Sequence, residues 1–136
     1  MREVRSFPAK FTEIDQILTW IRDSASSCGF QEKEVKRIEL SVEEVVVNIF
    51  HYSGLNETDS IKMKIQTDKT ILEIVIIDSG KPFDPTKMNH VPDMEASLEE
   101  RVIGGLGIYL MKRFIDEISY KREGSFNILS LKKTIS

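Results

Sequence analysis

Two polar side chains on one predicted helix have types and spacing that can serve as a general base and a ligand of a hard cation. Glu44 and Asn48 lie four residues apart within the apolar pattern of residues 35–49, so they share one flank of the apolar stripe, one turn apart. A carboxylate can act as a general base, and an amide oxygen suits a hard cation such as Mg²⁺. The alternative is a pair of ordinary polar surface residues, because this spacing arises easily.

A second group of polar residues follows the most apolar segment, residues 70–78. Asp78 ends this predicted strand, and Ser79, Gly80 and a proline-containing loop come after it. A carboxylate at the end of a buried strand needs hydrogen-bond donors, and the amino group of an adenine would be one. A glycine there lets a ligand lie close to the backbone. An ordinary Asp/Gly/Pro turn is the alternative.

A glycine cluster stands at the predicted start of a third helix, where Gly104, Gly105 and Gly107 surround Leu106. The free N–H groups of a first helical turn, together with the helix dipole, bind phosphate, and glycines permit close approach. A flexible hinge into the helix is the alternative. The chain contains neither a P-loop nor a dinucleotide-binding fingerprint, so a nucleotide site here would use another architecture.

In order and spacing, these three segments resemble the N, G1 and G2 boxes of the Bergerat-fold (GHKL, histidine-kinase-like) ATPases, the superfamily of gyrase, the heat-shock chaperone and histidine kinases. The resemblance rests on residues 44–48 (EVVVN), 78–85 (DSGKPFDP) and 100–110 (ERVIGGLGIYL), and it extends over residues 11–133. More closely, the chain is similar to the bacterial anti-sigma-factor serine kinases. This resemblance implies ATP and Mg²⁺ as cofactors and one histidine-kinase-like ATPase domain over residues 1–136.

The resemblance also implies a role for each matched residue. Glu44 would accept the proton of the attacking hydroxyl group, and Asn48 would bind Mg²⁺ and, through it, the phosphates. Asp78 would hydrogen-bond adenine, and Gly80 would shape the turn beneath the base. The other nucleotide-binding positions would be Arg101, Gly104, Gly105, Leu106, Gly107 and Asn127.

Some matched positions carry more specific expectations. Residues 85–104 would form a lid over the phosphates, and Asn127 in the last strand would reach toward the nucleotide. Relatives usually have His four residues after the metal-binding Asn, whereas this chain has Tyr52 there. His51, one residue earlier, is therefore expected at the surface or facing the lid rather than acting as a base. Arg101 is expected either to neutralise γ-phosphate charge or to form a solvated ion pair.

The predicted elements that position these groups change from helical to strand periodicity at residue 60. They are an edge strand at 2–7, amphipathic helices over 11–25 and 35–49, an antiparallel hairpin of 60–66 and 70–78, a third helix after residue 104, and strands at 117–123 and 126–134. Helices segregated from hairpins indicate an α+β fold. We expect a two-layer α/β sandwich with helices on one face of a mixed, mostly antiparallel sheet.

The composition limits the classes of protein that this chain can be. It has 136 residues, a net charge of −3, 40% hydrophobic and 30% charged residues, which is typical of one globular domain. A single cysteine and two histidines do not favour a structural zinc site. The apolar runs are too short to span a bilayer, and no secretory signal is visible, so we expect a cytoplasmic protein without a membrane partner. The slight acidity disfavours nucleic-acid binding.

Two functions remain from the sequence. The first is an ATP-dependent serine kinase that phosphorylates a small anti-sigma-factor antagonist on Ser and sequesters a sigma factor by partner switching. The alternative is a non-catalytic regulatory module that binds ATP or ADP as a structural ligand. The resemblance also implies a homodimer that pairs through the sheet and the first helix.

Overall fold

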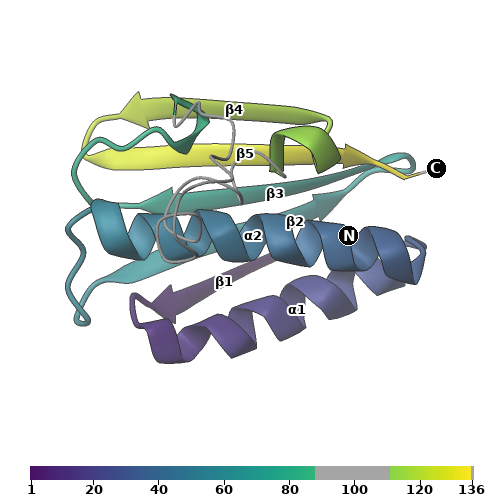
Figure 1. Ribbon diagram of the computed structural model, residues 1–136, viewed down its shortest axis with the longest axis horizontal. Coiled ribbons are helices and arrows are strands. Elements are labelled where there is room, and N and C mark those ends of the chain that lie inside the picture. Colours follow the sequence, from purple (N-terminus) through teal and green to yellow (C-terminus); the bar gives the residue numbers. More distant parts are fainter. Residues whose placement is uncertain (88–110, 136) are drawn as a thin grey trace, which may run out of the picture.

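Two helices cover one face of a five-stranded sheet in the computed structural model, which describes residues 1–87 and 111–135 (Figure 1). The helices are α1 (Ile14–Ser27) and α2 (Glu32–Tyr52), and the strands are β1 (Arg2–Pro8), β2 (Ser60–Thr67), β3 (Ile71–Asp78), β4 (Glu117–Glu123) and β5 (Phe126–Thr134). The strand order is β1-β2-β3-β5-β4, and each pairing is antiparallel. The expected α+β two-layer sandwich is confirmed.

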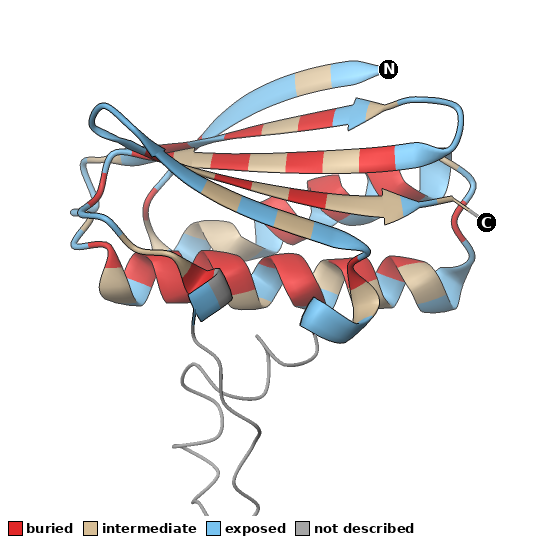
Figure 2. Cartoon of the chain, turned by 90° about the horizontal axis from the view of Figure 1, so that it is seen from above, coloured by how far each residue is buried: buried red, intermediate tan, exposed pale blue. Residues whose placement is uncertain are grey.

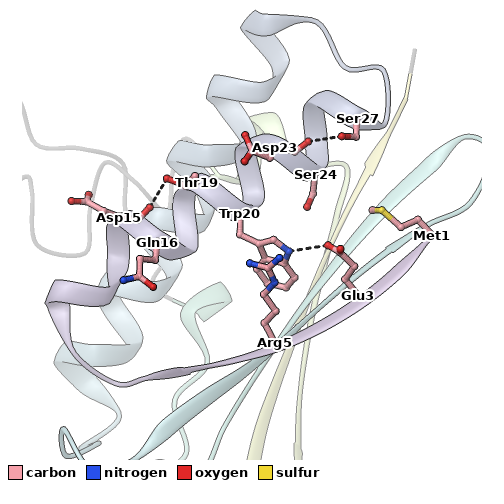
Figure 3. Close-up of a pocket in the computed structure, with 10 residues that line it drawn as sticks. All are labelled: Met1, Glu3, Arg5, Asp15, Gln16, Thr19, Trp20, Asp23, Ser24 and Ser27. Atoms are coloured by element: carbon pink, nitrogen blue, oxygen red, sulfur yellow. Dashed lines mark hydrogen bonds between the residues drawn. The ribbon is translucent and has the colours of Figure 1, made fainter.

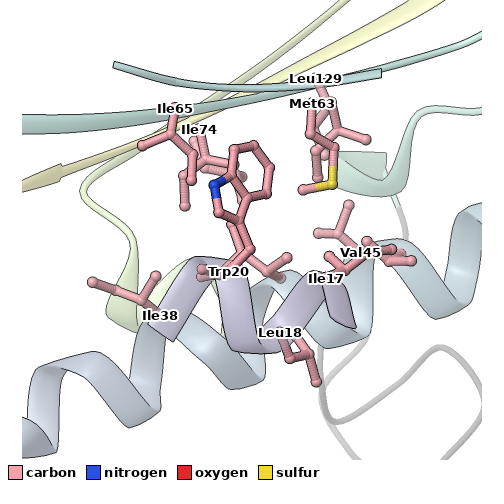
Figure 4. Packing of buried hydrophobic residues seen from close by; sticks show 14 of the residues in the cluster. Ile17, Leu18, Trp20, Ile38, Val45, Met63, Ile65, Ile74 and Leu129 are labelled. Carbon is pink, nitrogen blue, oxygen red and sulfur yellow. The ribbon is translucent and has the colours of Figure 1, made fainter. Parts of the chain in front are cut away.

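The core lies between the sheet and the two helices. Figure 2 shows buried and less buried residues alternating along the strands, as expected when one face of a sheet is covered. The indole of Trp20 extends from α1 toward Ile65 and Ile74 of the sheet (Figure 4). Burial of each large aliphatic side chain contributes about 1.5–3 kcal/mol, so the apolar stripes of α1 and α2 fix both helices to this face.

Side-chain contacts link the elements around the core. The guanidinium of Arg22 in α1 donates to both carboxylate oxygens of Glu39 in α2, at 3.2 and 2.7 Å. Arg37 of α2 lies over the ring of Phe114, 4.8 Å from its centroid. Gly29, with φ +97°, follows α1 in the left-handed region, which is typical of a glycine that ends a helix.

The predicted boundaries agree closely with those of the structure. Residues 11–13, expected at the start of the first helix, form a 3-10 turn before α1, and a second 3-10 turn spans Pro85–Lys87. Residues 111–114 are helical, as expected for the third helix. Its start, the glycine cluster and most of the expected lid lie outside the described residues. Within residues 1–87 and 111–135, no helix combines the length and the apolar character needed to cross a bilayer.

Candidate functional site

The last turns of α2 place Glu44 and Asn48 in direct contact. Asn48 is 1% exposed, and its Nδ2 atom donates to the backbone carbonyl of Glu44 at 2.8 Å and to Glu44 Oε1 at 3.1 Å. Burial raises the pKa of the Glu44 carboxyl above its usual value of 4.5, the hydrogen bond from Asn48 opposes this shift, and the charge of Glu43 adds to it. The predicted pair therefore forms a partly buried carboxylate held by an amide.

No group in the described part of the chain donates a hydrogen bond to the side-chain oxygen of Asn48. An uncharged oxygen beside a carboxylate suits a hard cation that keeps most of its ligands as water and phosphate oxygens.

Asp78 lies at the end of β3, is 3% exposed, and accepts two hydrogen bonds through one oxygen. The backbone N–H of Gly80 and Nδ2 of Asn127 both donate to Asp78 Oδ1, each at 2.9 Å. No described group donates a hydrogen bond to Oδ2. We expected this carboxylate to need hydrogen-bond donors, and Oδ1 has two of them. Oδ2 is the oxygen that a ligand could use.

Gly80 packs against the end of α2. A Cβ atom at this position would lie 2.5 Å from the carbonyl oxygen of Ser53 and 2.6 Å from its Cβ. The neighbouring N–H of Lys81 donates to the same Ser53 carbonyl at 2.9 Å, and the Ser53 hydroxyl donates to the carbonyl of Ile49. Glycine is therefore required by the backbone of α2, which ties the loop after Asp78 to the helix that carries Glu44 and Asn48.

Asn127 of β5 lies opposite Asp78 in the register of the sheet, and its side chain is 3% exposed. Besides Asp78, its Nδ2 atom donates to the carbonyl of Lys81 at 2.9 Å. Its Oδ1 atom accepts from the Tyr120 hydroxyl at 2.5 Å and from Arg122 Nη1 at 3.2 Å. The structure thus brings Asp78, Gly80 and Asn127 together.

Tyr120 and Arg122 are contacts that sequence reasoning missed. Both lie in β4, on the side of the sheet that Ile118 also faces, because side chains alternate along a strand. The sequence signal for this face of β4 is the alternation that places an apolar residue, an aromatic residue and an arginine two positions apart. Such a series leads from the apolar core toward a polar end of the strand.

His51 and Tyr52 lie in a chain of aromatic contacts at the end of α2. The exposed His51 ring is 5.1 Å from that of Phe11, and Tyr52 is 5.6 Å from Phe83. The expected surface position of His51 is confirmed. Five other predicted positions, Arg101, Gly104, Gly105, Leu106 and Gly107, lie outside the described residues.

A groove of about 450 Å³ lies between α1 and β1, away from these groups. Glu3, Arg5 and Trp20 line its floor, where Trp20 Nε1 donates to Glu3 Oε2 at 2.9 Å (Figure 3). The Arg5 guanidinium lies 5.0 Å from the centre of the indole. None of the predicted site residues lines this groove.

Comparison with known proteins connects these features to a family. Residues 7–133 match the family model described as the histidine kinase-like ATPase domain. A protein of Bacillus licheniformis named serine-protein kinase RsbW is 28% identical over 116 residues, covering 82% of this chain and 72% of the relative. A protein of the same name from Bacillus thuringiensis is 23% identical over 128 residues, covering 92% of this chain and 80% of the relative.

Solved structures share the fold. The structure of the RsbU and RsbW domains of Rv1364c from Mycobacterium tuberculosis gives a TM-score of 0.70 at 11% identity over 99% of this chain. This chain spans only 32% of that larger one. The SiaB–SiaC complex from Pseudomonas aeruginosa gives a TM-score of 0.60 at 17% identity, over 98% of this chain and 89% of that one.

Proposed function

The chain belongs to the family of histidine kinase-like ATPase domains, and on this premise we propose that it is an ATP-dependent serine kinase acting on a small anti-sigma-factor antagonist. The observation that carries the proposal is the contact between Asn48 Nδ2 and Glu44 Oε1 at 3.1 Å, together with the Asn48 oxygen, to which no described group donates. A transferase of this kind needs a proton acceptor beside a metal ligand, and Glu44 and Asn48 of α2 would fill these two roles. The relatives named serine-protein kinase RsbW support this choice of activity.

Asn48 is proposed to hold Mg²⁺ through Oδ1. Asn48 offers this one amide oxygen, and the described residues contain no cluster of three or more His, Cys, Asp or Glu side chains able to hold a metal. That donor set fits Mg²⁺, which is usually bound by one or two protein oxygens together with waters and substrate phosphates. When bound, the ion supplies neutralisation of phosphate charge.

Asp78 and Gly80 are proposed to hold the adenine of ATP. Oδ2 of Asp78 is the acceptor left for the exocyclic amino group, and the close packing of Gly80 against Ser53 keeps the backbone beneath the base in place. The predicted roles of Gly105 and Gly107 as phosphate-binding N–H donors, and of Arg101 toward the γ-phosphate, remain proposals. Asn127 completes this end of the site through its bond to Asp78.

Glu44 is proposed to orient the serine hydroxyl of the substrate and to accept its proton. The pKa of this carboxyl is raised toward neutral pH, and a general base works best when its pKa lies near the working pH. The hydrogen bond from Asn48 fixes the carboxylate on the helix, so less reorganisation is needed when the hydroxyl attacks. Phosphoryl transfer then depends mainly on positioning and on charge neutralisation.

Partner switching follows from the charge that the kinase adds. A phosphoserine carries about −1.5 to −2 charges near neutral pH, and at an interface it weakens the antagonist's binding by repulsion and desolvation. The released kinase would then bind and sequester a sigma factor, because two partners that compete for one protein are linked through their binding free energies. Pairing of two copies of the chain is likewise proposed and remains to be measured.

The experiment that tests the function measures both partners in one mixture. The chain is incubated with Mg-ATP, the candidate antagonist and the candidate sigma factor, and phosphoserine and the composition of complexes are followed over time. We expect phosphoserine to appear on the antagonist. The sigma factor is expected to enter a complex with the kinase at the same rate. Tight Mg-ATP binding and sigma-factor binding without any phosphoserine would instead indicate a non-catalytic regulatory module.

A further inference from the structure

A row of polar side chains crosses three strands at one end of the sheet. Asp78 in β3 is in register with Asn127 in β5, which is in register with Arg122 in β4. Residues in register project from the same face, and the preceding row on this face is apolar, with Ile76 opposite Leu129. The covered face therefore changes from apolar to polar where the proposed adenine site begins.

The Asn127 side chain has no hydrogen-bonding capacity left for a nucleotide. Its two N–H groups are used by Asp78 Oδ1 and by the carbonyl of Lys81, each at 2.9 Å. Its oxygen accepts from the Tyr120 hydroxyl, from Arg122 Nη1 and from the backbone N–H of Phe83. A side-chain amide has two donors and one oxygen with two lone pairs, so every site on it is occupied.

The ends of the row fix which way this amide points. The guanidinium of Arg122 can only donate, and an ionised Asp78 carboxylate can only accept. The amide therefore has its oxygen toward Arg122 and its nitrogen toward Asp78. In the reversed orientation, the amide nitrogen would face the Arg122 donor and the amide oxygen would face the Asp78 acceptor. The backbone N–H of Phe83, which can only donate, and the carbonyl of Lys81, which can only accept, favour the same orientation. Arg122 adds a charged donor on the oxygen side, whereas the Tyr120 hydroxyl can donate or accept and fits either orientation.

Arg122 is itself held in place by backbone carbonyls. Its Nη1 atom donates to the carbonyl of Gly80 at 2.7 Å, and its Nε atom donates to the carbonyl of Gly124 at 3.3 Å. Gly124 has φ +59° in the turn between β4 and β5. The arginine thus connects its own hairpin to the loop after Asp78.

We propose that Arg122 is a positioning residue that strengthens the preference of the site for adenine over guanine. Arg122 orients Asn127, Asn127 Nδ2 occupies Asp78 Oδ1, and Asp78 Oδ2 is left as an acceptor aimed at the ligand. An adenine amino group donates to that oxygen, whereas the guanine carbonyl at the equivalent ring position would face it with a second acceptor. This inference rests on the proposed ATP-binding function.

The test compares ATP and GTP affinities of the full chain and of Arg122→Met, measured by calorimetry with Mg²⁺ present. We expect the wild type to prefer ATP by about 100-fold or more, since a site built to pair a polar group strongly rejects an analogue that cannot make the bond. Arg122→Met is expected to reduce this preference about tenfold by weakening ATP binding alone, while Arg122→Lys, which keeps a donor-only cation, restores part of it. A purely structural role would weaken both nucleotides equally.

Lys121→Met is the matched control. Lys121 is the preceding residue of β4, its side chain is exposed and pairs with Glu123 at 3.2 Å, and it projects from the opposite face. We expect this variant to keep both affinities. Arg122→Gln also removes the charged donor but keeps a polar side chain, and it serves if Arg122→Met does not fold. It is expected to reduce the ATP preference by a similar factor.

The outcomes separate this inference from the proposed function. If the wild type binds ATP, and the ratio of ATP to GTP affinity in both Arg122→Met and Arg122→Gln stays within about twofold of the wild-type ratio, the positioning role alone would be contradicted. A wild-type chain that binds neither nucleotide would overturn the proposed function together with this inference.

Discussion

Asn48 Nδ2 donates to Glu44 Oε1 at 3.1 Å, so the proposed metal ligand holds the proposed base. Both residues lie on α2, one turn apart, and the same amide group also bonds the Glu44 carbonyl. A change in one side chain therefore alters the other as well as its own contact with a ligand. The variants that follow are chosen to separate these effects.

The pH dependence of phosphoryl transfer tests the state of Glu44. Burial raises the pKa of this carboxyl above 4.5, so we expect the rate at saturating ATP to fall as the pH is lowered through a value above 4.5. Glu43→Gln is expected to move this limb to lower pH, because the charge of Glu43 raises the pKa. An acidic limb that persists unchanged in the residual activity of Glu44→Gln would assign it to another group.

The stability of the fold offers a second readout of the same shift. A carboxyl whose pKa is higher in the folded state favours folding when protonated, and this contribution is lost as the pH rises through the folded-state value. We therefore compare the unfolding free energies of Glu44→Gln and the wild type, measured with urea, at about pH 4.5 and about pH 8. The variant should be more stable relative to the wild type at the higher pH than at the lower one. A difference in unfolding free energy that is the same at both pH values would argue against a raised pKa.

Asn48→Ala tests the proposed metal ligand. We expect the wild type to bind ATP more tightly with Mg²⁺ than with a chelator, and this gain to disappear in the variant, because the proposed ligand atom Oδ1 is removed. Ser41→Ala is a matched control on α2, since Ser41 is also buried and donates to the carbonyl four residues before it, at 2.8 Å. A Mg²⁺-dependent gain that survives in Asn48→Ala would contradict the assignment.

Gly80→Ala tests the contact between the loop after β3 and the end of α2. The added Cβ would lie 2.5 Å from the Ser53 carbonyl oxygen, and because backbone atoms are involved, the helix end and the loop must separate. We expect a loss of about 1–3 kcal/mol in unfolding free energy and weaker ATP binding. Ser79→Ala, at an exposed neighbouring position, should change stability by less than about 0.5 kcal/mol. Equal stability of the two variants would rule out the close packing.

Trp20→Phe separates fold stability from nucleotide binding. The substitution removes the hydrogen bond to Glu3 and leaves space in the core under the groove, so we expect a loss of about 1–3 kcal/mol in urea unfolding. ATP affinity at a temperature where the variant is folded should match that of the wild type. A large loss of affinity with little loss of stability would place the groove in the nucleotide site.

The helix and strand periods made much of the fold predictable. Glu44 and Asn48 share a helix face because the helical repeat places residues four apart together, and the last two strands occupy the residues that their alternating pattern predicts. The acceptor role of Asp78 also followed from an acid placed at the end of an apolar strand. These features depend on neighbours close in sequence.

The contacts between distant segments were not predictable from the pattern. Arg122 meets Gly80 across 42 residues of chain, and this contact requires knowing that β4 lies beside β5 and β5 beside β3. The need for glycine at position 80 was expected to come from a ligand, whereas in the structure the Ser53 backbone occupies the space where a Cβ would lie. Such tertiary contacts have no local periodicity that a single sequence can reveal.

The central claim is tested most directly by phosphoserine formation on the antagonist with wild type, Glu44→Gln and Glu43→Gln, each with its Mg-ATP affinity measured alongside. We predict transfer by the wild type and by Glu43→Gln, and a loss of about 10²–10⁴-fold in Glu44→Gln with ATP affinity within about threefold of the wild type. Unchanged transfer by Glu44→Gln, or no transfer by a wild type that binds both Mg-ATP and the antagonist, would contradict the account.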